Sequence, residues 1–273
     1  MKPQAPDIAA PPFDPATAWI GASPPAMERL TAAGPVLVHF FDFAQLNSVR
    51  ALPYVLAWGQ RYRDAGLAVL GVHSPRYPFT SSQAAVTEAA ARLAIEHPVA
   101  VDSDYAIWHD YGCRGWPSQF VWGPGGALRW FHFGEGEYEA TEEAIQGLLR
   151  ESRPGVELPA PLRPLRPTDA PGALVAPPSE EVFPGGSASE PWTAGDPDAV
   201  LELAYEAGGA YAAVDGRGEI RVELDGKPTG TVVVEHPGIH ELASHPAHES
   251  HRLALHASGE LRIWSVSFAA GVP

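Results

Sequence analysis

The first half of the chain alternates short apolar runs with stretches of helical spacing. The apolar runs predict buried strands at 35–41, 66–73, 99–101, 118–122 and 128–133. The Gly-Pro-Gly-Gly turn between the last two runs predicts a β-hairpin. Apolar residues at helical spacing predict helices at 47–65, 82–93 and 141–150. Strands that alternate with helices indicate an α/β sheet, here with an antiparallel hairpin at one side.

Two of these helices carry local signals. Pro53 lies inside 47–65 and predicts a kink, because proline lacks the amide hydrogen that the helix needs. Ser81 or Ser82 is expected to cap the helix at 82–93, since a serine hydroxyl accepts a bond from a free backbone amide of the first turn.

Beyond residue 198 the apolar residues change to a spacing of two. This spacing predicts strands at 199–205, 209–214, 219–224, 231–234, 251–256 and 261–268. Asp-Gly and Ser-Gly pairs between several of these runs provide turns. Short strands that follow one another at close intervals indicate an antiparallel β-sandwich or jelly roll.

The composition divides the chain into four segments. Proline- and alanine-rich residues without periodicity begin the chain, and a second proline-rich stretch separates its two patterned halves. We therefore predict a flexible N-terminal arm, an α/β domain, a linker and a β-sandwich domain at 1–14, 15–151, 152–178 and 179–273.

A surplus of acidic residues excludes several kinds of function. The chain has 18 Lys and Arg residues against 33 Asp and Glu residues, which gives a net charge of −15. Nucleic-acid binders need a basic patch for the phosphates, so no nucleic-acid partner is expected. No run reaches the roughly 18 consecutive apolar residues of a membrane helix, so no membrane insertion is expected. The first residues lack the continuous apolar stretch of a secretory signal, which predicts a cytoplasmic protein.

Residues 111–118 (YGCRGWPS) resemble the thioredoxin stretch that ends in the cis-proline loop. Further short blocks in matching order include 41–43 (FDF), 71–75 (GVHSP) and 132–136 (HFGEG). Together they resemble the thioredoxin-like or redoxin family (AhpC/TSA, TlpA-like), and within it the C-terminal region of DipZ-type thiol–disulfide proteins. The resemblance implies a thioredoxin-like α/β fold followed by a β-sandwich similar to a carbohydrate-binding module. It also implies a cis bond between Trp116 and Pro117. For the location of the protein, the resemblance implies an extracytoplasmic compartment as the alternative to the cytoplasm.

The active-site turn departs from the family pattern. The resemblance places the two redox cysteines of the family at Gln45 and Ser48, and a single peroxiredoxin-like cysteine at Ala44 or Gln45. Disulfide exchange and peroxide reduction both start from a thiolate, which none of these residues supplies. We therefore predict a degenerate active site in a non-catalytic peptide- or protein-binding module.

Ser48 leaves a second interpretation open. A serine nucleophile needs a base, and His39 and His73 lie on strands whose ends could approach this turn. The simpler interpretation is that Ser48, or equally Asn47, caps the helix that follows.

Cys113 is the only cysteine, so it forms neither an internal disulfide nor a CxxC pair. Its ordinary role would be that of a small, buried apolar residue. The alternative is a thiol activated by Arg114, which would make the protein a thiol-dependent oxidoreductase for thiol–disulfide or peroxide chemistry. Whether the chain is an enzyme is therefore open on sequence alone.

Polar residues around the former active-site turn predict a binding cleft. The candidate binding residues are Asp42, Gln45, Asn47, Arg50, His73, Trp116 and Pro117. In thioredoxin-like folds this cleft holds an extended peptide, so we expect a peptide or protein partner there. Trp116 is either a binding platform or a filler of the space left by the lost disulfide.

The second half offers two further candidate sites. His245, His248 and His251 recur at intervals of three, but their segment reads as a loop that enters a strand. They are weak metal-ligand candidates, and neither a metal nor another cofactor is expected. Sandwich domains can stack sugars on aromatic residues, so glycan binding is a further alternative. Its candidates are Trp192, Tyr205, Tyr211 and Trp264, of which Tyr205 and Trp264 are expected to face the core.

Overall fold

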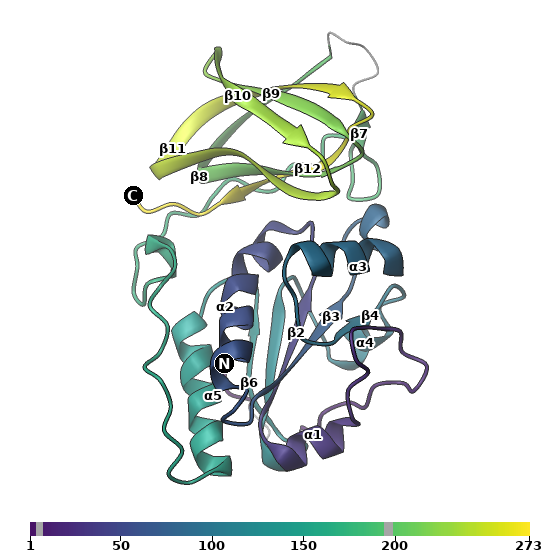
Figure 1. The fold of residues 1–273 in the computed structure, drawn as a ribbon. Coiled ribbons are helices and arrows are strands. Elements are labelled where there is room, and N and C mark those ends of the chain that lie inside the picture. Colours follow the sequence, from purple (N-terminus) through teal and green to yellow (C-terminus); the bar gives the residue numbers. More distant parts are fainter. Residues whose placement is uncertain (4–7, 194–198) are drawn as a thin grey trace. The chain divides into compact units, whose positions relative to one another are not determined.

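A computed structural model describes residues 1–3, 8–193 and 199–273 (Figure 1). Residues 4–7, which fall in the predicted N-terminal arm, and residues 194–198 lie outside the described residues. The chain forms two compact units. The first unit comprises Met1–Phe43, Asn47–Pro75 and Thr80–Leu165. The second unit comprises Ala44–Leu46, Arg76–Phe79 and Arg166–Pro273.

The first unit is built on a mixed β-sheet. Its strands are β1 (Trp19–Ile20), β2 (Val36–Phe41), β3 (Ala68–His73), β4 (Val99–Val101), β5 (Ser118–Trp122) and β6 (Leu128–Phe133). They lie in the order β1-β4-β3-β2-β5-β6. β2, β3 and β4 run parallel, whereas β1, β5 and β6 run antiparallel to their neighbours. The pair of β5 and β6 confirms the hairpin predicted at one side of the sheet.

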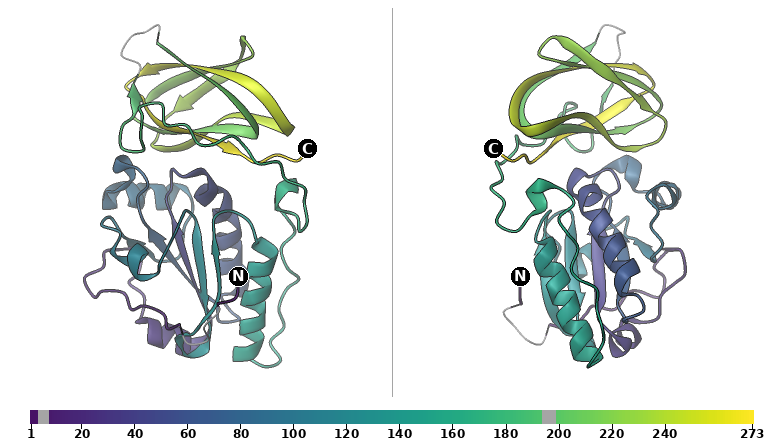
Figure 2. Two further views of the ribbon diagram at one scale, coloured as in Figure 1. Left: turned by 180° about the vertical axis from the view of Figure 1, so that it is seen from behind. Right: turned by 60° about the vertical axis from the view of Figure 1, so that its left-hand side comes forward.

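Helices cover both faces of this sheet. They are α1 (Met27–Ala33), α2 (Leu46–Tyr62), α3 (Gln83–Arg92), α4 (Ala106–Asp110) and α5 (Tyr138–Ser152). α2 and α5 lie side by side on one face of the sheet (Figure 2). Their residues form one hydrophobic cluster with Leu37 of β2. Residues of α1 and α4 form another cluster with Val38, the next residue of β2. Successive side chains of a strand point to opposite faces, so the two clusters lie on opposite sides of the sheet.

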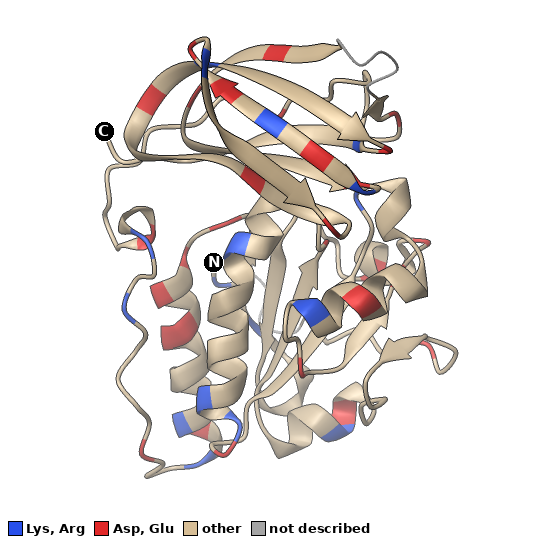
Figure 3. Cartoon of the chain, turned by 45° about the horizontal axis from the view of Figure 1, so that its top comes forward, with Lys and Arg blue, Asp and Glu red and all other residues tan. Residues whose placement is uncertain are grey.

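The cap predicted for α3 is confirmed: the helix begins after Ser82, whose Oγ accepts a hydrogen bond from the backbone nitrogen of Ala85 at 3.2 Å. Pro53 lies inside α2, and the kink expected there stays a prediction. α5 carries Glu139 in its first turn and Arg150 in its last turn, which complements the helix dipole (Figure 3). Short 3₁₀ helices lie at Pro78–Thr80, Pro124–Gly126 and Pro167–Asp169.

The second unit is an antiparallel β-sandwich. Its strands are β7 (Trp192–Thr193), β8 (Val200–Asp215), β9 (Gly218–Leu224), β10 (Lys227–Val234), β11 (Gly238–Gly259) and β12 (Arg262–Ala269). They lie in the order β10-β9-β11-β8-β12-β7. Figure 2 shows the strands curling around a common interior, which is filled by a hydrophobic cluster that includes Ala212, Ile220 and Val266. The predicted fold class, a thioredoxin-like α/β fold followed by an all-β antiparallel sandwich, is confirmed.

β8 and β11 are longer than the sequence pattern indicates. The strands predicted at 199–205 and 209–214 form the single strand β8, and the loop predicted around 245–250 belongs to β11. The pairing of β11 with β8 shifts register between Ser244 and Glu249, so the strand carries a bulge there. The extra residues of a bulge do not follow the alternation of a regular strand, which explains why the pattern reads as a loop.

Burial lowers the pKa of two neighbouring histidines of the first unit, His39 and His97, far below the ordinary value. His39 of β2 is fully buried, and neither of its ring nitrogens has a hydrogen-bond partner among the described residues. Burial and the neighbouring His97 lower the pKa of His39 to about 3. Burial lowers the pKa of His97 to about 4. Both imidazoles are therefore uncharged at neutral pH, where the ring of His39 stacks on Phe41 with centroids 5.4 Å apart.

We predict that His39→Leu makes the stability of the protein less dependent on pH. Below the ordinary histidine pKa of 6.5, the unfolded state binds a proton that the folded state does not. As the pH falls, the free energy of unfolding therefore decreases by up to about 1 kcal/mol per pH unit, until the pH approaches the pKa of the folded state. Urea unfolding at a series of pH values between 6.5 and the folded pKa of about 3 measures the loss.

The variant should show a smaller slope than the parent in this range. The remaining slope comes from His97, His73 and the other histidines whose pKa burial lowers. His109→Leu, at an exposed histidine, is the matched control and should keep the full slope. An unchanged slope in His39→Leu would contradict burial of His39 as the cause.

Candidate functional site

The parallel strands of the first unit bring polar residues to one edge of the sheet. Asp42 follows β2, Ser74 follows β3 and Asp102 follows β4, and all three are buried. The carboxyl ends of parallel strands lie at the same edge. β5 runs antiparallel to β2 and begins with Ser118 opposite Phe40, so the loop before β5 reaches this edge too. The candidate site consists of these strand ends and that loop.

Asp42 is held inside the fold by hydrogen bonds. Thr80 Oγ1 donates to Asp42 Oδ2 at 2.5 Å, and the backbone nitrogen of Asp42 donates to Ser48 Oγ at 3.3 Å. His73 Nε2 lies 4.0 Å from Asp42 Oδ2 and accepts a bond from the backbone nitrogen of Phe43 at 3.5 Å. Burial lowers the pKa of His73, although Asp42 acts in the opposite direction. The imidazole is therefore neutral, and the predicted neighbours Asp42 and His73 do come together.

Gln45 and Ser48, to which the resemblance assigns the redox pair, lie where α2 begins. Gln45 directly precedes the helix, and Ser48 is its third residue. Neither Ser48 nor Asn47 precedes the helix, so the N-cap expected at one of them is wrong. A helix N-terminus stabilises a thiolate placed there. The local environment for such a thiolate is thus retained, while the side chains are a half-buried amide and a buried hydroxyl.

Asp102 joins three segments of the site. Its carboxylate accepts hydrogen bonds from the backbone nitrogens of Ile107 at 2.9 Å and Trp108 at 3.0 Å, at the start of α4. Ser74 Oγ donates to it at 2.7 Å. Burial raises the pKa of Asp102, and these bonds to the carboxylate oppose that rise. Its role is to hold α4 and the end of β3 against the end of β4.

Trp116 is fixed beside this carboxylate. The bond between Trp116 and Pro117 is cis, as the resemblance implies. The indole Nε1 donates to the backbone oxygen of Ser74 at 2.8 Å. Its ring lies on Trp108 with centroids 4.4 Å apart and an angle of 34° between the planes. The side chain remains half-buried. Trp116 thus has a defined orientation at the site before anything binds.

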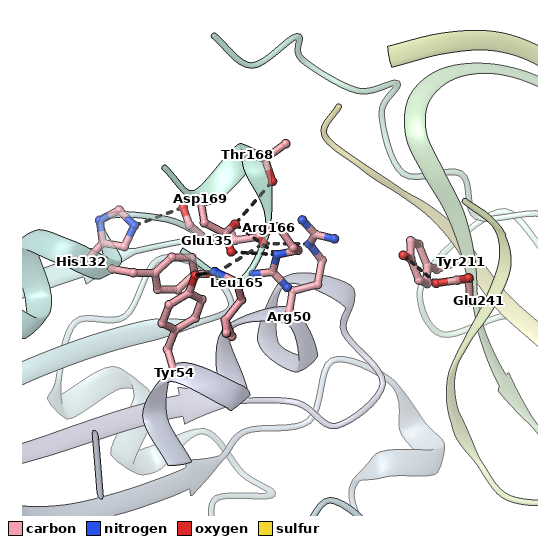
Figure 4. Close-up of polar contacts among 11 residues, drawn as sticks. Arg50, Tyr54, His132, Glu135, Leu165, Arg166, Thr168, Asp169, Tyr211 and Glu241 are labelled. Carbon is pink, nitrogen blue, oxygen red and sulfur yellow. Dashed lines mark hydrogen bonds and ion pairs between the residues drawn. The ribbon is translucent and has the colours of Figure 1, made fainter. Parts of the chain in front are cut away.

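Arg50 of α2 forms an ion pair with Glu135, which follows β6 (Figure 4). Arg50 Nε and Glu135 Oε1 are 2.7 Å apart, and the side chains are only 12% and 20% exposed. The hydroxyl of Tyr138 lies 3.5 Å from the same oxygen. Nearby, Tyr54 stacks on Tyr138 and accepts a hydrogen bond from the backbone nitrogen of Leu165 at 2.7 Å. The charge of Arg50 is therefore balanced within the first unit.

Cys113 does not have the environment of a reactive thiol. It is half-buried and packs against the hydrophobic cluster that contains Phe120. Burial raises the pKa of its thiol well above the ordinary range, although a hydrogen bond with Ser118 lowers it. Only the thiolate is a good nucleophile, so this thiol is poorly suited to attack at neutral pH.

In the second unit, two of the three candidate histidines meet. The rings of His245 and His251 stack with centroids 4.3 Å apart, and Glu249 lies beside them. His248 is not part of this group among the described residues. Its backbone nitrogen donates to the backbone oxygen of Val272 at 2.7 Å.

The aromatic candidates of the second unit are mostly engaged in its own packing. Tyr205 is buried in the sandwich core, as its spacing of two predicts. Trp264 is buried but is not part of that cluster, and its indole Nε1 donates to Asp215 Oδ1 at 2.9 Å. Trp192 is half-buried and packs against the hydrophobic cluster. Tyr211 is half-buried, and its hydroxyl donates to Glu241 at 3.1 Å.

The fold and the site define a two-part protein: a thioredoxin-like domain with a cis-proline loop, and an antiparallel β-sandwich that follows it. Among the described residues, no helix combines the length and apolar character needed to cross a membrane. No protein-family model matches the chain.

Sequence comparison shows similarity to Protein DipZ of Mycobacterium bovis, with 32% identity over 269 residues. The match covers 85% of this chain, which spans 38% of the length of that relative, and Protein DipZ of Mycobacterium tuberculosis matches equally. Thiol-disulfide oxidoreductase YkuV of Bacillus subtilis is 29% identical over 135 residues, which cover 50% of this chain and 90% of YkuV. These similarities confirm the expected family: the chain belongs to the thioredoxin-like proteins of the DipZ type.

Solved structures of thioredoxin-like proteins also match. A thiol-disulfide isomerase from Corynebacterium glutamicum has a TM-score of 0.46 and 19% identity, and the match covers 51% of this chain and 96% of that one. A thioredoxin-like superfamily protein has a TM-score of 0.48 and 21% identity, with 55% and 99% covered.

Three residues of the buried network are not among the sequence candidates. Ser74 and Asp102 each come directly after a predicted strand, and this position at the carboxyl edge of a parallel sheet is a signal that identifies them. Thr80 lies in a 3₁₀ helix between β3 and α3 and offers no such signal. Its partner Asp42 is distant in sequence, so only the folded chain reveals their contact.

We predict that Cys113 reacts slowly in the native protein. At neutral pH an aromatic disulfide reagent should modify it at least about 100-fold faster in denaturant, because each unit of raised pKa lowers the thiolate fraction tenfold. Intact mass follows the modification. Ser103→Cys in a Cys113→Ser background places a thiol at an exposed position and should react quickly in both states. Equal native and denatured rates for Cys113 would refute the burial argument.

Proposed function

We propose that this chain is a non-catalytic peptide- or protein-binding module on a thioredoxin-like scaffold. The observation that carries the proposal is the occupation of the family's two redox positions by Gln45 and Ser48. An amide and a hydroxyl form no mixed disulfide, so the redox cycle cannot start at this turn. The polar groups nearest the turn, Asp42 and His73, contribute to a hydrogen-bonded network instead of activating a nucleophile.

The surroundings of the lost redox pair support binding. Trp116 precedes the cis-proline, is half-buried and has its indole fixed by Ser74 and Trp108. A preoriented aromatic side chain loses little conformational entropy when a ligand packs on it. The residue before the cis-proline is also where thioredoxin-like folds bind extended peptides. We therefore propose that an extended peptide segment of a protein partner packs on Trp116.

A thiol-dependent oxidoreductase that uses Cys113 is the alternative. YkuV, which matches half of this chain, is named a thiol-disulfide oxidoreductase. Against this alternative stand the burial of Cys113 and the raised pKa of its thiol. Glycan binding by the second unit has less support, because Tyr205 is buried in the sandwich core and Trp264 is also buried, with its indole bonded to Asp215.

We predict that the double substitution Gln45→Cys and Ser48→Cys forms an intramolecular disulfide and gains insulin-reducing activity. The two positions flank the first turn of α2, where the helix N-terminus stabilises a thiolate. Intact mass under oxidising conditions detects the disulfide, and insulin turbidity with dithiothreitol measures turnover. The parent chain and Cys113→Ser should both show only the uncatalysed rate.

The single substitution Ser48→Cys is the matched control, since one thiol cannot close the ring. Turnover by the parent that disappears in Cys113→Ser would overturn the non-catalytic proposal. Failure of the double variant to form its disulfide would contradict the placement of the redox positions at Gln45 and Ser48.

We also predict that peptides selected from a random phage library on the immobilised full chain bind through Trp116. Trp116→Ala should weaken binding of the synthetic peptides by about 10-fold or more, since anchoring aromatic residues carry much of a peptide's binding energy. Trp130→Ala, at a half-buried tryptophan of β6, controls for general loss of packing. Calorimetry measures both affinities. No enrichment of peptides, or equal losses in the two variants, would count against this site.

A further inference from the structure

The bulge in β11 brings together side chains that the proposed function does not use. In an extended strand, residues six positions apart are separated by about 20 Å. The ring centroids of His245 and His251 are nevertheless 4.3 Å apart. Ser244 pairs with Gly209 of β8, and Glu249, five residues further along β11, pairs with Ala207, only two residues away on β8. The excess length folds this part of β11 back on itself.

Backbone contacts fix the bulge. The backbone nitrogen of His248 donates to the backbone oxygen of Val272 at 2.7 Å. A Cβ atom on Gly271 would lie 2.8 Å from the Cα of His248, so glycine is needed where the C-terminal segment passes the bulge. The positions of His245 and Glu249 on either side of His248 are therefore set by the backbone.

Three potential ligand atoms converge at this point. One nitrogen from each of His245 and His251 and one carboxylate oxygen of Glu249 lie within 4.8 Å of one another. Ligand atoms about 2.1 Å from a tetrahedral zinc ion are roughly 3.4 Å from each other. The distance between His251 Nε2 and Glu249 Oε2 is 3.2 Å. Small side-chain movements would bring all three atoms around one ion.

Both imidazoles are oriented by a second residue. His251 Nδ1 bonds with Asp225 Oδ2 at 2.8 Å, and its Nε2 therefore faces Glu249. His245 Nε2 bonds with the hydroxyl of Tyr205 at 2.7 Å. Histidine ligands of metals usually bond through their other nitrogen to a carboxylate or another oxygen, which fixes the ring and its tautomer. The arrangement of Asp225, His251 and Glu249 has this form.

We propose that His245, Glu249 and His251 bind a Zn²⁺ ion, with Asp225 and Tyr205 as positioning residues. Two imidazoles and one carboxylate suit zinc, whereas Mg²⁺ and Ca²⁺ prefer oxygen ligands throughout. The side chains of His251 and Glu249 are 18% and 38% exposed, so water can supply a further ligand. The ion would join the bulge of β11 to β8 and to the turn between β9 and β10.

The sequence does not predict this ligand set. It suggests His248 as the third histidine, and the fold directs His248 into the backbone contact with Val272 instead. Glu249 comes close because of the bulge, Tyr205 comes from β8, and Asp225 comes from the turn between β9 and β10. The inference is independent of the binding function proposed for the first unit.

Calorimetric titration of the EDTA-treated full chain with ZnCl₂ tests the proposal. We expect one saturable site per chain. His245→Ala and His251→Ala should each weaken binding about 100-fold or more, since each removes a ligand. Asp225→Asn should weaken it about 10- to 100-fold and keep the stoichiometry, since it changes only the orientation of His251. The double substitution His236→Ala and His240→Ala, at a stacked pair outside the ligand set, should keep the parent affinity.

Two further measurements separate a built site from adventitious binding. Zn²⁺ should raise the melting temperature of the parent chain and not that of His245→Ala. Co²⁺ should give the strong visible absorption of a four-coordinate site in the parent, and lose it in Glu249→Gln. Absence of a saturable site, or parent-like affinity in the doubly substituted His245→Ala, His251→Ala chain, would overturn the proposal. If circular dichroism shows either histidine variant to be unfolded, Glu249→Gln and Asp225→Asn decide the outcome.

Discussion

The buried carboxylate of Asp102 is the interaction on which the candidate site depends. It accepts bonds from the first turn of α4 and from the hydroxyl of Ser74, whose backbone oxygen in turn accepts the indole of Trp116. A buried carboxylate that loses its donors is costly, so these segments are strongly coupled. The cis-proline loop is thereby held at the sheet edge by hydrogen bonds and ring packing, with no covalent link.

The polar groups around the start of α2 are engaged in the same kind of structural contact. In a redox protein, the first turn of this helix holds the reactive thiolate, and the neighbouring groups set the pKa of its thiol. Here Asp42 binds Thr80, the ring of His73 is neutral and Arg50 is paired with Glu135. The polar groups stabilise the shape of the edge. In the binding function proposed above, a ligand would contact that shape and the half-buried ring of Trp116.

Sequence reasoning succeeds where a feature has a local cause. Ser82 caps α3 through a contact three residues away, and alternating apolar residues locate most strands. It fails where distant segments decide the outcome. Ser48 looks like a helix cap but bonds to Asp42, and Thr80 acquires its role only through the approach of β2. Residues around 245–250 look like a loop because a bulge, fixed by the C-terminal segment, interrupts their alternation.

The edges of the two sheets have a consequence for association between chains. In the first unit, the outer side of β6 is occupied by the chain's own beginning: Leu128 donates to Ile8, and Phe131 donates to Met1. In the second unit, β7 has only two residues, and β10 carries Lys227 and Pro228 at its start. Short, proline-bearing or covered edges are poor templates for strand addition. The sheets are thus protected against the edge-to-edge pairing that leads to aggregation. Without this protection, a fold with strands as long as β8 and β11 would be prone to such pairing.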